Sequence, residues 1–456
     1  MEAILMTSAR SDGLTDEIAD VINTGMSRRG VVRAGALVLG LGALAGGAPA
    51  TAAGAAPATD RTGVRPFSVH IPRRVLDDLG RRLSATRWPD PETVTDTSQG
   101  VPLELMRDVA QYWATRYDWR RFEAQLNSLP QFMTAIDGLD IHFIHVRSLH
   151  PNALPVLVTH GWPGSIVEQL KIIAPLVDPT AYGASASDAF HVIIPSIPGY
   201  GFSARPTTTG WGPDHVASAW VELMNRLGYG RFVVAGGDVG SVVNTAMARL
   251  APPQLIGLHT SLPATVPVDI ARAMQCGDSP PPGLSADERR AYLQLANQSA
   301  KHFAYSSEMH TRPQTLYGLA DSPVAMAGWL LDHGDGDDQP AAAIVSALHG
   351  AQEYLTRDDV LDNLTVYWFT NTGISSARFY WENTISPVNA ADLSIPAAVT
   401  VFPSELYQAP RSWAERAYHD LIYFHEADEG GHFAAWEQPL IYAAELRAGF
   451  RPLRPA

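Results

Sequence analysis

The stretch Arg231-Phe-Val-Val-Ala-Gly-Gly-Asp-Val-Gly-Ser241 decides the fold of this chain. Its apolar residues, Phe232 to Ala235, predict a short buried strand, and Ser241 to Leu250 has the spacing of a helix. Small residues on both sides of Asp238 allow the sharp strand-to-helix turn called a nucleophile elbow, which lifts one side chain above a sheet. Taken alone, the motif is equally compatible with an aspartate that caps the following helix.

The residue at the tip of this predicted turn is a carboxylate, Asp238. Such turns usually carry serine in the pattern G-x-S-x-G. A carboxylate changes the chemistry, because an ester formed on aspartate can be hydrolysed at the enzyme's own carbonyl. The sequence therefore predicts attack on an electrophilic carbon. A serine esterase is disfavoured, since Ser241 lies on the helix beyond the turn.

Apolar runs alternate with helical stretches on both sides of the elbow. Strands that read as continuous apolar runs separated by helices indicate a mostly parallel sheet covered on both faces, an α/β fold. The predicted strands are Pro155 to Thr159, His191 to Pro195, Leu255 to Leu262, Ala397 to Phe402 and Ile422 to Glu426. The predicted helices are Ile166 to Leu176, Asp214 to Leu227 and Leu440 to Gly449. Gln131 to Ile136 and Ile141 to Val146 predict a β-hairpin at the start of the sheet.

The pattern divides the chain into five parts. Residues 1–63 are predicted to be an export signal and a disordered spacer, and residues 64–147 an N-terminal extension that leads into the sheet. Residues 148–262 and 394–456 are predicted to form the core. Between these two parts the apolar runs typical of strands no longer recur, and residues 263–393 are predicted to be an inserted helical lid.

The N-terminal part has the features of a twin-arginine export signal. Ser27-Arg28-Arg29 and Arg33 precede an apolar run, rich in Ala and Gly, from Ala34 to Ala48. The run is shorter than the roughly 20 residues that a spanning helix needs. We therefore expect a cleaved signal near position 50, a secreted or extracytoplasmic enzyme, and no stable membrane anchor.

Composition narrows the partners. The chain has 456 residues, 46% of them hydrophobic and 18% charged, which suits one large α/β core with an insertion. A formal net charge of -14 disfavours nucleic acid and anionic lipid, because both attract clustered Lys and Arg. The single cysteine, Cys276, excludes an internal disulfide and a Cys-rich metal site.

A nucleophile of this kind needs a base and an acid that orients the base. In folds built on this elbow the order along the chain is nucleophile, acid, histidine. Of 15 histidines, His432 alone follows the final predicted strand in a Gly-rich loop ahead of a helix. The acid is expected after the preceding strand, where Glu405 stands. Three acids in the loop of His432 compete with it in sequence and are disfavoured by this order: Glu426, Asp428 and Glu429.

Two loops are expected to donate hydrogen bonds to the charge that develops on an oxygen. One donor is the backbone N–H after the nucleophile, that of Val239. The other comes from His160-Gly161-Trp162-Pro163-Gly164-Ser165, where Trp162 is the predicted donor because Pro163 has no N–H. The alternative interpretation of this second loop is a tight turn without a role in catalysis.

Together these motifs resemble the microsomal-type epoxide hydrolases. The resemblance rests on His160 to Ser165, Gly236 to Ser241, Phe402 to Glu405 and Gly430 to Pro439, and it runs from about Pro66 to the C-terminus. It implies an α/β-hydrolase fold with that family's N-terminal segment, a small-molecule epoxide as substrate, and no metal or organic cofactor.

The resemblance also singles out two tyrosines in the lid. Tyr305, six residues before Thr311-Arg312-Pro313, and Tyr380, in Arg378-Phe379-Tyr380-Trp381, match the two proton-donating tyrosines of the family. The chain departs from the family pattern at Val239, which replaces a tryptophan, and at the N-terminus, where an export signal replaces the membrane anchor of the animal enzymes.

The implied reaction opens an epoxide to a vicinal diol. Asp238 attacks an epoxide carbon while Tyr305 and Tyr380 deliver a proton to the ring oxygen. His432, oriented by Glu405, then activates water against the resulting ester, and the N–H groups of Trp162 and Val239 bind the oxyanion.

Two other functions remain open at this point. A haloalkane dehalogenase shares the aspartate, acid and histidine but needs halide-binding N–H donors, and chloride release from a chloroalkane would identify it. An exported binding protein could retain the fold without activity, and an assay of epoxide hydrolysis separates it from an enzyme. The sequence leaves the particular epoxide and the oligomeric state undetermined.

Overall fold

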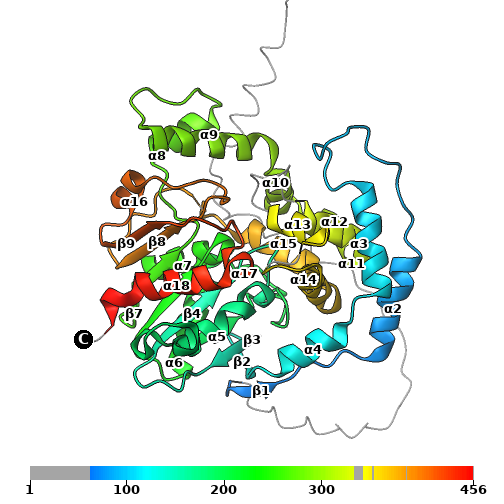
Figure 1. Ribbon diagram of the computed structural model, residues 1–456, viewed down its shortest axis with the longest axis horizontal. Helices are drawn as coiled ribbons and strands as arrows, with labels where there is room; N and C mark the ends of the chain where they lie inside the picture. The colour runs from blue at the N-terminus through cyan, green and yellow to red at the C-terminus, as the bar shows by residue number, and fades with distance from the viewer. Residues whose placement is uncertain (1–61, 333–341, 352–353, 387, 455–456) are drawn as a thin grey trace, which may run out of the picture. The chain divides into compact units, whose positions relative to one another are not determined.

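The computed structural model describes residues 62–332, 342–351, 354–386 and 388–454 (Figure 1). The predicted export signal lies outside these ranges. Within them, no helix combines the length and the apolar character that crossing a membrane requires.

The described strands form one nine-stranded sheet in the order β1-β2-β3-β5-β4-β6-β7-β8-β9. The first four in this order pair antiparallel, and the pairs from β5 and β4 through to β9 are parallel. The mostly parallel sheet predicted from the apolar runs is therefore confirmed. The strands are β1 (Arg65–Phe67), β2 (Gln131–Ile136), β3 (Leu139–Val146), β4 (Leu154–Thr159), β5 (Phe190–Pro195), β6 (Phe232–Gly236), β7 (Leu255–Thr260), β8 (Ala397–Val401) and β9 (Leu421–Glu426).

Helices cover both faces of the parallel strands. Every residue of β6 and of β8 is buried, which explains why these strands are continuous apolar runs and not alternating ones. The helices α6 (Pro213–Arg226) and α7 (Asp238–Leu250) pack on each other, as do α5 (Ile173–Val177) and α18 (Pro439–Phe450).

Two predicted helices begin or wind differently in the structure. The helix after the elbow begins at Asp238 itself, three residues before the predicted Ser241, because Asp238 already turns the chain into the helix. The predicted helix Ile166 to Leu176 is a 3₁₀ helix, η1 (Ile166–Ile172), followed by α5. The first turn of η1 is buried on all sides, and its Glu168 side chain bonds back to the backbone of Gly161, which suits a tighter winding.

Helices without an intervening named strand fill the described residues between β7 and β8. The two ends of this insertion lie side by side, since Val266 N–H donates to Val388 and Ala391 N–H donates to Ala264. The helices are α8 (Val268–Gln275), α9 (Ala286–Lys301), α10 (Ala304–Thr311), α11 (Gly318–Asp321), α12 (Pro323–Leu331), α13 (Ala342–Leu348), α14 (Arg357–Thr370) and α15 (Gly373–Glu382).

The N-terminal helices pack on this insertion. In Figure 1 they lie beside α11, α12 and α14, and they are α2 (Arg73–Ser84), α3 (Leu103–Thr115) and α4 (Trp119–Asn127). The Trp113 indole N–H donates to Thr365 at 2.9 Å, and Tyr117 and Arg121 both bond Asp362, at 2.7 and 2.6 Å. Aromatic residues of this segment thus pack against the insertion, and part of the surface that they contact is the helix α14.

Candidate active site

The elbow holds Asp238 in a backbone conformation that few side chains adopt. Its φ is +46°, in the left-handed region, at the junction of β6 and α7. Small neighbours make the turn possible: a Cβ on Gly240 would lie 2.1 Å from the carbonyl oxygen of Thr159. The strained turn therefore projects the Asp238 carboxylate from the first turn of α7, where the helix dipole favours negative charge.

His432 faces this carboxylate. Its Nε2 lies 3.5 Å from Asp238 Oδ2, and its Nδ1 lies 2.5 Å from Glu405 Oε1. The ring is buried, and Glu405 is 4% exposed. The loops that carry the two residues are joined by the Ser404 N–H, which donates to the carbonyl of Gly430 at 3.1 Å. The structure thus arranges a carboxylate, an imidazole and a second carboxylate in a row.

The three competing acids in the His432 loop do not take part in this row. Glu426, Asp428 and Glu429 are all exposed. The Glu405 side chain also accepts the N–H of Leu406 at 2.7 Å, which fixes the oxygen that faces the ring. Among the candidates from the sequence, the structure brings Glu405 to His432.

Two backbone N–H groups hold the Asp238 carboxylate. Trp162 N–H donates to Asp238 Oδ1 at 2.8 Å, and Val239 N–H hydrogen-bonds the same carboxyl group. Both are the donors expected from the sequence. Trp162 N–H binds Oδ1, whereas the other oxygen, Oδ2, lies beside His432. Donors placed in this way can stabilise an oxyanion formed at the same carbon.

The charges of the site support one another. Burial would raise the pKa of Asp238, but His432 and the two N–H donors outweigh it and hold that pKa below its ordinary value. Burial would likewise lower the pKa of His432, whereas Glu405 and Asp238 raise it well above its usual range. The resting site is therefore an aspartate anion beside a protonated imidazole.

Two tyrosines from the insertion cover the site. The Tyr305 ring, on α10, stacks on Trp162 with centroids 5.0 Å apart, and the Tyr380 ring, on α15, meets Trp162 edge-on at 5.7 Å. The two phenol rings lie 6.3 Å apart. Burial and the Asp238 carboxylate raise the pKa of both phenols, so both keep their protons. The structure thus brings two protonated phenols to the same cavity as Asp238.

This cavity has a volume of about 700 Å³. Asp238, Val239, Tyr305 and Tyr380 line it, and α8 and α9 contribute mainly apolar side chains, such as Met274 and Ala296. A largely apolar cavity with a few convergent polar groups is typical of a small-molecule site.

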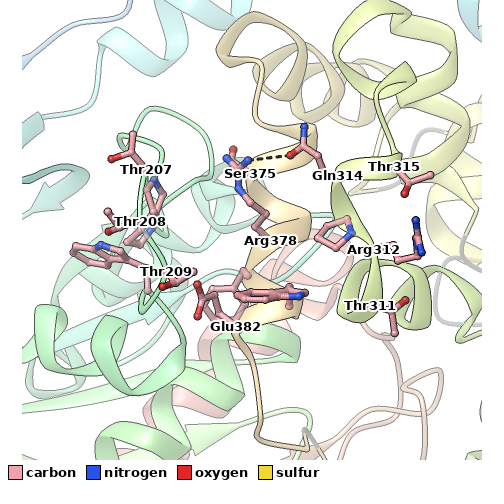
Figure 2. A pocket seen from close by; sticks show the side chains of 16 residues that line it. Thr207, Thr208, Thr209, Thr311, Arg312, Gln314, Thr315, Ser375, Arg378 and Glu382 are labelled. Atoms are coloured by element: carbon pink, nitrogen blue, oxygen red, sulfur yellow. Dashed lines mark hydrogen bonds between the residues drawn. The ribbon is translucent and has the colours of Figure 1, made fainter. Parts of the chain in front are cut away.

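Figure 2 shows a second hollow, of about 840 Å³, on another face of α15. Ser375, Arg378, Phe379 and Glu382 point into it, whereas Tyr380 lines the catalytic cavity. Arg378 reaches Gln314 across it at 3.4 Å. Among the described residues, none lines both spaces, and this hollow contains none of the site residues predicted from the sequence.

Several residues that hold the site together gave no signal in the sequence. Asn363 and Tyr367, on α14, bond the loop after Trp162: Asn363 donates to the carbonyl of Pro163 at 2.8 Å, and Tyr367 donates to that of Gly164 at 2.8 Å. On the other side of Trp162, Glu168 accepts the N–H of Gly161 at 2.8 Å. For Glu168 the sequence offered one hint, which is the presence of an acidic residue within the apolar run after the loop.

The described part of the chain contains no group of three or more His, Cys, Asp or Glu side chains arranged to bind a metal ion.

Comparison with known proteins agrees with this geometry. Residues 64–169 match the family model described as epoxide hydrolase N terminus, and residues 155–292 match that of the alpha/beta hydrolase fold. The chain is 49% identical over 393 residues to a protein of Stigmatella aurantiaca named "Putative epoxide hydrolase", covering 86% of each chain. It is 33% identical over 399 residues to epoxide hydrolase 1 of Oryctolagus cuniculus, covering 84% of this chain and 88% of that protein.

A solved structure shares the same architecture. The juvenile hormone epoxide hydrolase of the silkworm Bombyx mori superposes with a TM-score of 0.75 at 27% identity, covering 86% of this chain and 96% of that one. An α/β-hydrolase fold, a matching N-terminal segment and relatives of this similarity lead to one assignment. The chain is an enzyme of the microsomal-type epoxide hydrolase family.

Proposed function

We propose that this enzyme hydrolyses a small-molecule epoxide to a vicinal diol through a covalent ester on Asp238. One observation carries the proposal: the Asp238 carboxylate has one oxygen bound by Trp162 N–H at 2.8 Å and the other oxygen 3.5 Å from His432 Nε2. Two protonated tyrosines line the same cavity. A nucleophile, a base and acids in one cavity are the groups that opening a strained ether requires.

In the first step Oδ2 of Asp238 attacks an epoxide carbon. The bond from that carbon to the ring oxygen breaks, and Tyr305 and Tyr380 hydrogen-bond the oxygen and supply its proton. The low pKa of Asp238 keeps the nucleophile ionised, and the raised pKa values of the tyrosines keep the acids protonated. The product of this step is a hydroxyalkyl ester of Asp238.

In the second step water attacks the carbonyl carbon of that ester. Forming the ester removes the negative charge of Asp238, which is one of the two charges that raise the pKa of His432. That pKa therefore falls once the nucleophile has reacted, so the imidazole can give its proton to the phenolate left by the first step and is then free to act as a base. It takes a proton from water, and the N–H groups of Trp162 and Val239 bind the oxyanion until the diol leaves.

A single turnover in water enriched in ¹⁸O tests this pathway. With enzyme in excess over styrene oxide, the oxygen from solvent is expected in the Asp238 carboxylate, and the first diol released carries none. Peptide mass spectrometry locates the label. Label in that first diol, with none in Asp238, would mean direct attack of water and would refute the covalent step.

We propose an epoxide as the substrate because the similar proteins are named as epoxide hydrolases. A panel of small and bulky epoxides, assayed with the wild type and with Asp238→Asn, tests reaction class and cavity size together. We expect turnover by the wild type alone. A chloroalkane in the same panel tests the dehalogenase alternative by chloride release.

We further propose that residues 1–63 direct export through a twin-arginine signal, on the strength of Arg28-Arg29 and the apolar run that follows. N-terminal sequencing of the exported protein is expected to begin near position 50. A mature protein that still contains the Arg pair would contradict the proposal.

A further inference from the structure

A small cavity borders Asp238 and is distinct from the substrate cavity. Its volume is about 20 Å³, close to the space that one water molecule occupies. Gly161, Glu168, Gln169 and His432 are among the residues that line it. Asp238 alone, among the described residues, lines both this cavity and the large apolar one.

Glu168 is the second carboxylate of this small cavity. It is 5% exposed, and its Oε1 accepts the N–H of Gly161 at 2.8 Å and the side-chain amide of Gln169 at 3.0 Å. Its other oxygen, Oε2, occupies the place of a side chain at Gly164, where a Cβ would lie 1.8 Å away. The loop therefore leaves a space that this carboxyl group fills.

Gln169 supplies a second sign that the cavity holds a hydrogen-bonding molecule. It is 4% exposed, and its amide oxygen Oε1 has no hydrogen-bond partner among the described residues. A buried acceptor of this kind is normally satisfied by ordered water. Gln169, Glu168 and His432 are three of the polar side chains that line the cavity, and two to four partners are what a buried water needs.

We propose that this cavity holds the water that hydrolyses the Asp238 ester, and that Glu168 positions this water together with His432. The inference rests on the covalent pathway proposed above. One hydrogen of the water points to His432 Nε2 and the other to Glu168. The water oxygen bonds to the carbonyl carbon of Asp238, its proton passes to His432, and the bond to the diol oxygen breaks, with the diol taking that proton.

The charges around Glu168 favour this role at the required moment. Burial raises the pKa of Glu168 to about 7, and the negative charge of Asp238 contributes to the rise. Once Asp238 is an ester that contribution ends, so the pKa falls and the carboxylate form is favoured. The charge of His432 acts in the opposite direction to that of Asp238 and lowers the pKa of Glu168. Tyr367 and Tyr442 also lie near, and burial raises the pKa of both, so they stay neutral.

Glu168→Gln tests the proposal, since glutamine keeps an acceptor for Gly161 N–H but has no charge. In single turnovers of styrene oxide, followed by rapid quench and intact-protein mass spectrometry, we expect ester formation to change less than about 3-fold. Ester hydrolysis is expected to slow by about 10- to 100-fold, as for the loss of a hydrogen bond to a charged group. Any dependence of the hydrolysis rate on the ionisation of Glu168 is expected to disappear.

Glu437→Gln is the matched control. Glu437 is also a buried carboxyl near His432, its pKa is also raised to about 7 by burial, and it accepts the Phe433 N–H at 2.9 Å, but it does not line the small cavity. This variant is expected to leave both steps unchanged. Thermal melting of both variants checks that the fold is retained.

Four other results would contradict the proposals, and each can be told from the others. If Glu168→Gln slows ester formation and hydrolysis equally, the residue only braces the oxyanion loop, and the proposal is wrong. Unchanged hydrolysis in Glu168→Gln, or an equal loss in Glu437→Gln, also overturns it. If the wild type itself forms no ester, the covalent pathway fails first, and that result is read from the wild type alone.

Discussion

The side-chain amide of Asn363 donates to the carbonyl of Pro163 at 2.8 Å, although 200 residues separate the two in the chain. Asn363 also accepts the hydroxyl of Ser165 at 2.7 Å. Both partners belong to the loop whose Trp162 N–H binds the Asp238 carboxylate. A helix of the insertion, α14, therefore holds in place the loop whose N–H binds the Asp238 carboxylate, and the N-terminal segment packs on that same helix through Trp113 and Arg121.

Asn363→Ala is expected to weaken catalysis without touching a reacting group. The change leaves the buried carbonyl of Pro163 without this donor, which costs about 1–3 kcal/mol of stability. Displacing an oxyanion donor typically lowers the rate by up to about 10²- to 10³-fold, and a loosened loop is expected to lose about 10-fold in kcat. Steady-state kinetics and thermal melting measure both effects.

Two variants calibrate that result. Tyr367→Phe removes one hydroxyl, the donor to Gly164, and is expected to have the same effect with a smaller magnitude. Asn225→Ala, on the exposed side of α6, is expected to change neither kcat nor melting temperature. A stability loss in Asn363→Ala with kcat at the wild-type value would show that the contact serves folding alone.

His432→Gln is expected to separate the two chemical steps. The nucleophile Asp238 and both tyrosines remain, so the ester forms, but no base activates water and the ester accumulates. Loss of general base catalysis lowers the hydrolysis rate by about 10²- to 10⁴-fold. Intact-protein mass spectrometry after mixing with styrene oxide detects the added mass.

His425→Gln is the control, because this histidine stands on β9, half exposed, and bonds Glu445 and not a site residue. It is expected to turn over normally. Failure of His432→Gln to accumulate an ester, together with normal first-step chemistry in the wild type, would remove His432 from the role of base.

Glu405→Gln is expected to slow hydrolysis and to move its pH dependence. Glu405 raises the pKa of His432, and after ester formation the charge of Asp238 no longer contributes. Removing the Glu405 charge lowers the pKa of His432, so the acid limb of the hydrolysis rate moves to lower pH. The maximum rate is expected to fall by about 10²-fold, since the ring loses its orienting partner.

Rates of ester hydrolysis measured from pH 5 to 9 show this shift. Asp428→Asn, a change to an exposed acid in the same loop as His432, is expected to leave the profile unaltered. An acid limb that stays in place in Glu405→Gln, or that moves in Asp428→Asn, would assign the orienting charge to another group.

Tyr305→Phe and Tyr380→Phe are each expected to slow ester formation by about 10- to 100-fold, and the double change by about 10²- to 10⁴-fold. Both hydroxyl groups have a pKa raised above the ordinary value near 10, so ester formation in the wild type is expected to stay constant up to about pH 10. Stopped-flow or rapid-quench measurements of the first step give these rates.

Tyr292→Phe provides the comparison within the same cavity. Its hydroxyl donates to the carbonyl of Asp278 at 2.7 Å and not toward Asp238. It is expected to react at the wild-type rate. If one of the two substitutions, Tyr305→Phe or Tyr380→Phe, leaves the rate of ester formation unchanged and the other accounts for the whole decrease, a single phenol supplies the proton.

Much of the fold follows from local pattern. The strands lie within a few residues of their predicted bounds, because a strand buried on both faces must be continuously apolar whatever its neighbours are. The elbow was also predictable from local sequence, because only small residues permit such a turn. The predicted start of the following helix, Ser241, was three residues too late. The helix α7 begins at Asp238, whose φ is in the left-handed region, and the periodicity of side chains carries no information about the φ of one residue.

The site was predictable only in part. Asp238, His432 and Glu405 follow from their places in the order of strands, and Tyr305 and Tyr380 from resemblance to a family. Neither periodicity nor spacing indicates Asn363, because its partners are 198 and 200 residues away in the chain. The sequence placed Glu168 in the predicted helix Ile166 to Leu176 and gave it no role in the site.

The sequence by itself determined the elements, their order, and the kinds of side chain that each loop carries. These depend on local sterics and on the burial of apolar surface, which neighbouring residues specify. The order of the strands favoured Glu405 over the other acids, but tertiary structure decided that it meets His432 and which carboxyl borders the small cavity beside Asp238. Those outcomes depend on how separate loops approach one another, as when Ser404 bonds Gly430 and so brings Glu405 to His432 while Asp428 remains in solvent.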